Sequence, residues 1–155
     1  MASWAEFAVA SPEIGAAGRR LISRAAGGTA FLATIRGDGL PRINPVTVEI
    51  IDGRLVSFVI VDSAKFGDLF ADGRYALHAY QDPAAPTEFQ VRGRAHEVTD
   101  PELRGAAVAS WRFEADDSYR LFDFSIEQVV LGERSGPDEW PPHYTSWRSP
   151  TEISG

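Results

Sequence analysis

The sequence predicts a mainly β fold with flanking helices. Short runs of residues with strand character recur between positions 29 and 133, and several of them are apolar on both faces. Tight turns at 37–39 (GDG) and 52–53 (DG) connect the first three runs into a meander. Helical patterns are confined to the N-terminus and to two connections, at 63–73 and 100–114. Strands that are apolar on both faces and joined by hairpins favour a closed or half-closed barrel.

The composition is that of one globular domain. The chain has 155 residues, of which 44% are hydrophobic and 24% are charged. Its formal charge of −7 argues against nucleic acid as a partner, because neutralising phosphates requires a basic face. The absence of Cys excludes disulfides, thiolate zinc sites and thiol nucleophiles. No apolar run has the length of a membrane span and no secretory leader is recognisable, so we expect no membrane partner and a cytoplasmic location.

Residues 1–28 are predicted to form an N-terminal helical segment. The clearer of its two helical patterns begins at Ser11, a suitable N-cap, with Pro12 in the first helical position. The pair Gly27-Gly28 is expected to end this helix. The segment should pack over one end of the sheet.

The next three strands are predicted at 29–36, 42–51 and 54–61. The middle strand is interrupted by Pro45, which lacks the N–H that a central ladder position requires. This proline therefore predicts a sheet edge or a bulge. Asp52-Gly53 is the clearest hairpin turn in the chain.

The stretch 63–73 (SAKFGDLFADG) is predicted to be a short amphipathic helix. Ser63 is its expected N-cap, and Gly73 is expected to follow its C-terminus with a positive φ angle. One helical face carries the apolar residues Phe66, Leu69 and Phe70. Lys65 lies in the first turn, where a cation opposes the helix dipole, and it is the only Lys in a chain with 15 basic residues. Either it is an ordinary solvated Lys or it helps to bind an anion together with free backbone N–H groups and the Ser63 hydroxyl.

The rest of the chain continues the β pattern. Strands are predicted at 74–81, 88–98 and 119–133, with a bulge or close packing at Gly93 and a bend near Ser125. Asp100 is expected to cap the helix at 100–114. The tail from residue 135 is rich in proline and is predicted to be irregular, with Trp140 and Trp147 packed against the body beside the functional pocket. The expected organisation is thus a single domain consisting of helices (1–28), a barrel (29–134) and a packed tail (135–155).

The histidines do not form a metal motif. His78, His96 and His143 are far apart in the sequence and show no ligand spacing, so no metal site is predicted. No constellation of acid, base or nucleophile is recognisable either, and no catalytic residue is predicted.

An ordered set of segments resembles the pyridoxamine 5′-phosphate oxidase-like split-barrel flavoprotein superfamily. The matching segments are AFLATIRGDGLPRINPV (30–46), the DG hairpin, the S-x-K start of the 63–73 helix, DGRYALHAY (72–80) and FQVRGRAHEVTDPEL (89–103). The similarity spans roughly residues 15–133. It implies a six-stranded antiparallel split β-barrel, a homodimer and a flavin bound across the dimer interface. FMN is the expected cofactor and the deazaflavin coenzyme F-420 is the alternative. A few relatives bind haem, which we do not expect here.

The resemblance also implies which residues contact the cofactor. The S-x-K element binds the flavin phosphate in the family, which corresponds here to Ser63 and Lys65. Strand residues around the proline and on the following strand lie near the flavin ring, and they correspond to Arg42, Asn44, Val46, Thr47, Phe58, Val59 and Ile60.

The function implied is that of an oxidoreductase that transfers hydride or electrons between FMN, or F-420, and a small organic substrate. The chain lacks the full set of Arg and His residues that bind the substrate phosphate in true pyridoxamine-phosphate oxidases, which argues against vitamin B6 oxidation. The alternative is a non-catalytic flavin- or haem-binding carrier or sensor. The sequence does not identify the substrate.

Overall fold

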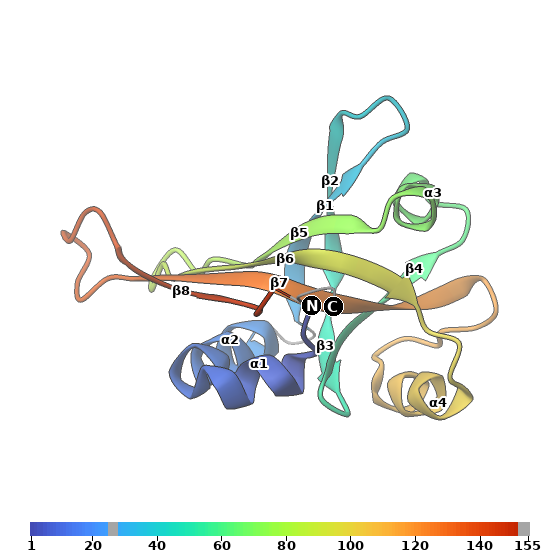
Figure 1. Cartoon of the computed structure of the whole chain (residues 1–155), viewed down its shortest axis with the longest axis horizontal. Helices are drawn as coiled ribbons and strands as arrows, with labels where there is room; N and C mark the ends of the chain where they lie inside the picture. The colour runs from blue at the N-terminus through green and yellow to red at the C-terminus, as the bar shows by residue number, and fades with distance from the viewer. Residues whose placement is uncertain (25–27, 152–155) are drawn as a thin grey trace.

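A computed structural model describes residues 1–24 and 28–151. The strands form one curled antiparallel sheet in the order β2-β1-β5-β6-β7-β4-β3, with β8 paired to β7 (Figure 1). The predicted mainly β architecture with flanking helices is confirmed. The number of strands is eight instead of six, because the second predicted strand is divided in two and the tail adds another. None of the helices in the described ranges has the length and hydrophobicity of a membrane-spanning segment.

Two helices cover one face of the sheet at the N-terminus. They are α1 (Trp4–Ala10) and α2 (Pro12–Arg24), and both lie beneath β7 and β8 in Figure 1. Ser3 and Glu6 form a reciprocal capping box at the start of α1. Trp4 anchors α1 on the sheet, with its ring centroid 6.1 Å from that of Phe89. Gly27, which we expected to help end α2, is outside the described residues.

The first four strands are β1 (Thr29–Ile35), β2 (Pro41–Thr47), β3 (Glu49–Ile51) and β4 (Arg54–Ile60). Pro45 lies on β2, at the edge of the sheet, as its missing N–H predicted. The break between β2 and β3 falls at Val48, whose N–H donates to the carbonyl of Gly28 at 2.9 Å instead of to a neighbouring strand. The β3–β4 hairpin turns at Asp52 and Gly53, with φ angles of 49° and 72°.

The predicted helix is α3 (Ala64–Ala71), and Ser63 is its N-cap as predicted. The predictions for Gly73 and Phe70 were wrong. The last helical residue is Ala71, Asp72 is the C-cap, and Gly73 does not have a positive φ angle. What requires glycine at position 73 is space, because a Cβ there would lie 2.6 Å from the carbonyl oxygen of Ala95. Phe70 is 72% exposed and does not share the buried face of the helix. Leu69 is buried there, and the unexpected partner beside it is Asp68.

The second half of the sheet consists of β5 (Arg74–Ala79), β6 (Glu88–Glu97) and β7 (Tyr119–Glu133), with α4 (Pro101–Ser110) between β6 and β7. Asp100 caps α4 as predicted. The predicted irregularity at Gly93 is a β-bulge, since Arg92 pairs with Gln128 and Gly93 pairs with Ile126. The extra residue on β7 is therefore Glu127, close to the bend predicted at Ser125.

The tail is more regular than the sequence suggested. Residues His143–Arg148 form β8, which pairs with residues 128–133 of β7. Trp147 packs on the body, with its ring centroid 5.2 Å from that of Phe7. Trp140, in contrast, is 72% exposed. The prediction of an irregular tail was wrong for residues 143–148, because backbone pairing with β7 and the packing of Trp147 hold β8 in place.

Strand β4 separates two hydrophobic cores. Leu55 and Val59 point into the main core, which extends from the N-terminal helices to α3. Val56 and Phe58 point the other way, into a smaller core that is closed by α4. The apolar character of both faces of this strand is therefore explained by burial on both sides.

Candidate functional site

A cleft of about 320 Å³ lies between α3, β2, β4 and the segment that precedes β7. The lining residues share a largely apolar character, and they are Thr29, Pro45, Val46, Thr47, Phe58, Ile60, Lys65, Phe113 and Tyr119. They come from positions that are up to 90 residues apart in the sequence, so only the tertiary fold creates the cleft.

Five of the residues predicted to contact a cofactor meet in this cleft: Val46, Thr47, Phe58, Ile60 and Lys65. Strand alternation explains why Phe58 and Ile60 line it together, since side chains two apart share a face of β4. Val59 lies between them, and its side chain is fully buried in the main core on the opposite face. Asn44 does not line the cleft, although it lies on the same strand as Val46.

One wall of the cleft is aromatic. The ring centroids of Phe113 and Tyr119 are 5.2 Å apart, and that of Tyr119 is 6.5 Å from that of Phe58. Trp111 supports this wall from behind, edge-on to Phe58 at 4.9 Å. The sequence reasoning missed Phe113 and Tyr119. The signal that could have found them is the set of aromatic residues from Trp111 to Tyr119, since large aromatic side chains are seldom left in water.

Lys65 is the only charged residue that lines the cleft within the described part of the chain. No carboxylate in residues 1–24 and 28–151 forms an ion pair with it. It lies in the first turn of α3, where the backbone N–H groups have no acceptor within the helix. A cation and free N–H groups at one helix start form a site with affinity for an anion, and an anion there offsets the unfavourable position of Lys65 at the positive end of the helix dipole.

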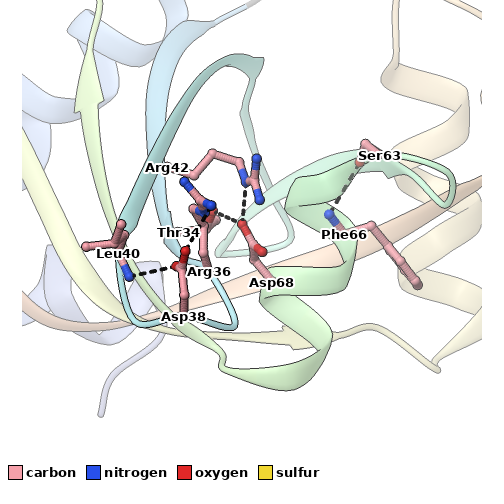
Figure 2. A network of polar contacts seen from close by, with 8 residues as sticks. All are labelled: Thr34, Arg36, Asp38, Leu40, Arg42, Ser63, Phe66 and Asp68. Atoms are coloured by element: carbon pink, nitrogen blue, oxygen red, sulfur yellow. Dashed lines mark hydrogen bonds and ion pairs between the residues drawn. The ribbon is translucent and has the colours of Figure 1, made fainter.

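Ser63 is already engaged within the turn. Its Oγ donates to the carbonyl oxygen of Ile60 at 2.7 Å. The same Oγ accepts from the N–H of Phe66 at 3.3 Å (Figure 2). The residue therefore caps α3 and shapes the turn that presents Lys65. Its hydroxyl can donate to an anion only if it gives up its hydrogen bond to the Ile60 carbonyl.

Arg42 is directed to a different partner. Its Nε donates to Oδ2 of Asp68 at 2.8 Å, and the same carboxylate oxygen accepts from the Thr34 hydroxyl at 2.7 Å (Figure 2). Burial raises the pKa of the Asp68 carboxyl, but the hydrogen bonds from Arg42 and Thr34 outweigh it and hold that pKa below its usual value. Arg42 is not among the residues that line the cleft.

The lining defines the kind of ligand that the cleft can hold. Aromatic and aliphatic walls suit a flat, mostly apolar ring system, and the α3 start suits a phosphate or a similar anion. The threonines at 29 and 47 supply polar groups beside the apolar walls. A phosphorylated flavin has both of these parts, so the residues present fit such a cofactor.

Residues 23–131 match the family model for pyridoxamine 5′-phosphate oxidase. A pyridoxamine 5′-phosphate oxidase-related, FMN-binding protein from Nostoc punctiforme has a TM-score of 0.64 at 16% identity, over 91% of this chain and 96% of that one. A heme-binding protein from Mycobacterium smegmatis has a TM-score of 0.62 at 19% identity, over 85% of this chain and 57% of that one. A NimC/NimA family protein from Clostridium acetobutylicum has a TM-score of 0.61 at 16% identity, over 81% and 93%.

No curated protein matches the sequence. At identities of 16–19%, the solved structures establish the shared fold and nothing finer. The sequence match is what assigns the family, because it spans most of the chain, from the end of α2 through β7. On this evidence the chain belongs to the pyridoxamine 5′-phosphate oxidase family.

Proposed function

We propose that this protein is an oxidoreductase that binds FMN in the cleft between α3, β2 and β4 and acts on a small organic substrate. The observation that carries the proposal is the isolated Lys65 beside an aromatic and aliphatic cleft that has no carboxylate in its lining. Such a combination favours a ligand with a flat ring and an anionic end. FMN has both features, and coenzyme F-420 is the alternative cofactor.

The proposed roles follow from position. Lys65 and the first-turn N–H groups of α3 bind the phosphate, while Ser63 holds the turn in shape. Val46, Thr47, Phe58 and Ile60 face the ring, joined by the aromatic wall of Phe113 and Tyr119. When bound, the flavin supplies the capacity to accept and donate hydride or single electrons. The protein supplies orientation and a largely apolar surface beside the ring.

The same proposal includes a homodimer. An apolar stripe crosses the outer face of β1 and β2, where Phe31 and Ile43 are 41% and 68% exposed, and Leu40, just before β2, is 56% exposed. Phe31 pairs in register with Pro45, which lines the cleft, so the stripe and the cleft are continuous. A second copy of this chain on the stripe would bury these residues and extend the cleft, whose volume of about 320 Å³ is at the lower end for a ligand of this size.

A haem-binding function is less well supported. Histidine is a common axial ligand of haem iron, and none of the three histidines lines the cleft in the described residues; Tyr119 is the one cleft residue of a type that binds haem iron. His143 lies on β8, away from α3. The remaining alternative is a flavin-binding carrier or sensor that uses the same cleft.

Two measurements test the proposal. Apo-protein is titrated with FMN, F-420 and riboflavin, with flavin fluorescence and absorbance as the readout. Saturable FMN binding that is stronger than riboflavin binding is expected, because only FMN has a phosphate for Lys65. The loaded protein is then reduced anaerobically and mixed with small organic acceptors. Repeated turnover identifies an enzyme, whereas a protein that binds FMN and never turns over is a carrier or sensor. Absence of FMN binding would refute the proposal.

A further inference from the structure

We infer that Asp68, clamped by Arg42 and Thr34, is a positioning residue that holds the start of α3 against β2 and so sets the anion contact of the cleft. This inference rests on the proposed FMN function, and it assigns Arg42 a role that is different from direct contact with the cofactor. The three residues lie on three different elements, namely β1, β2 and α3.

The clamp is compact. Oδ2 of Asp68 accepts from Thr34 Oγ1 at 2.7 Å and from Arg42 Nε at 2.8 Å. Thr34 and Arg42 are directly opposite each other in the β1–β2 register, so they present their donors side by side. Asp68 is 7% exposed and Thr34 is 1% exposed, which means that little water competes for these bonds. Bonds to a buried carboxylate are stronger than those of an exposed ion pair.

The clamp joins the two sides of the cleft. Arg42 precedes the cleft residues of β2 (45–47) by three positions, which is about 10 Å along a strand. Asp68 follows Lys65 by three positions, so both lie on neighbouring parts of one face of α3. A shift of α3 relative to β2 would therefore move Lys65 and the first-turn N–H groups relative to the cleft wall.

Apolar side chains hold α3 against the main core. Leu69 is buried against the main core and Phe66 contacts Phe122 edge-on, with ring centroids 5.9 Å apart. Both contacts hold the side of α3 that faces the main core. Phe70, next in the apolar pattern, is 72% exposed and contributes no buried contact to β2. The ion pair between Arg42 and Asp68 adds a direct polar link between α3 and β2.

The test is the selectivity of the full-length protein for FMN over riboflavin, which differ only in the phosphate. The variant Arg42→Gln/Asp68→Asn removes the ion pair of the clamp and leaves the net charge unchanged, so the electrostatic attraction for the phosphate is preserved. The matched control is Asp72→Asn/Arg74→Gln, which removes an exposed pair (2.6 Å) just beyond the same helix without linking α3 to β2. Dissociation constants for both flavins are measured by fluorescence titration.

A charge-assisted contact with the phosphate should give the wild type an FMN-to-riboflavin affinity ratio of about ten or more. Loss of the clamp is expected to lower this ratio by about fivefold or more. Riboflavin affinity should stay within about twofold of the wild type, and the control should change neither value. An unchanged ratio in the folded variant would overturn the inference, as would an equal loss for both flavins, which indicates general loosening. A wild-type protein without FMN preference would instead overturn the proposed function.

The double variant removes a partly buried pair, so its folding is checked by circular dichroism. If it does not fold, Arg42→Met/Asp68→Leu replaces the pair by apolar side chains, a change that buried ion pairs often tolerate. The same fall in the affinity ratio is expected for this variant, because α3 again loses its directional contact with β2. Retention of the full ratio would overturn the inference.

Discussion

Replacing Lys65 with alanine is expected to weaken FMN binding and to leave the fold intact. Lys65 has no ion-pair partner in the described residues and lies where a cation opposes the helix dipole, so the free energy of unfolding should change by less than about 0.5 kcal/mol. Against a phosphate, the lost charge-assisted hydrogen bond is worth about 1.5–3 kcal/mol, which corresponds to a roughly 10- to 150-fold weaker affinity. Isothermal titration with FMN, together with thermal melts in its absence, measures both quantities.

Two controls make this experiment specific. Riboflavin affinity should remain within about twofold, because Lys65 acts on the phosphate alone. Arg112→Ala removes the same unit of charge from an exposed position next to Phe113 and should reduce FMN affinity by no more than about twofold. Equal losses in the two variants would show that net charge, not a local contact, controls binding. Unchanged FMN affinity in Lys65→Ala would place the phosphate elsewhere and refute the reasoning.

Four other predictions follow from the packing and the polar contacts. Ser63→Ala should lower the free energy of unfolding by about 1 kcal/mol in urea melts, because α3 loses its N-cap; no loss would mean that the cap is dispensable. Trp147→Ala should cost about 2 kcal/mol, whereas Trp140→Ala, at a 72% exposed position, should cost less than about 1 kcal/mol; similar losses would contradict the docking of β8. The stability advantage of the wild type over Asp68→Asn should be present above about pH 4 and shrink as the pH falls through the lowered pKa of Asp68, so an advantage that does not narrow in acid would contradict the clamp. Ile43→Asp should convert the proposed dimer to monomer in light scattering, and a wild-type protein that is already monomeric at micromolar concentration would exclude the dimer.

Local chemistry allowed the sequence to predict much of the fold. Turns, caps and edges depend on single residue types: Asp52-Gly53 adopts the positive φ angles of a tight hairpin, and Ser63 caps α3. Pro45 lies at a sheet edge because it has no N–H to donate to a second neighbour. The family resemblance could also be seen in the sequence, because it depends on the order of the segments along the chain, and the family match supports it.

What only the tertiary structure decided involves partners that are distant in the sequence. Asp68 was not singled out from the sequence, because its buried hydrogen bonds come from Thr34 and Arg42, which lie on strands about 30 residues earlier. The aromatic wall reaches the cleft because β7 pairs with β4, which brings Tyr119 opposite Ile60. Strand β8 was not predicted for the same reason. Its side chains are mostly exposed apart from Trp147, and its backbone hydrogen bonds are made to β7. Hydrophobic periodicity in the sequence indicates which residues are buried by apolar packing. It does not predict a strand or a buried carboxylate that is held by hydrogen bonds to residues far along the chain.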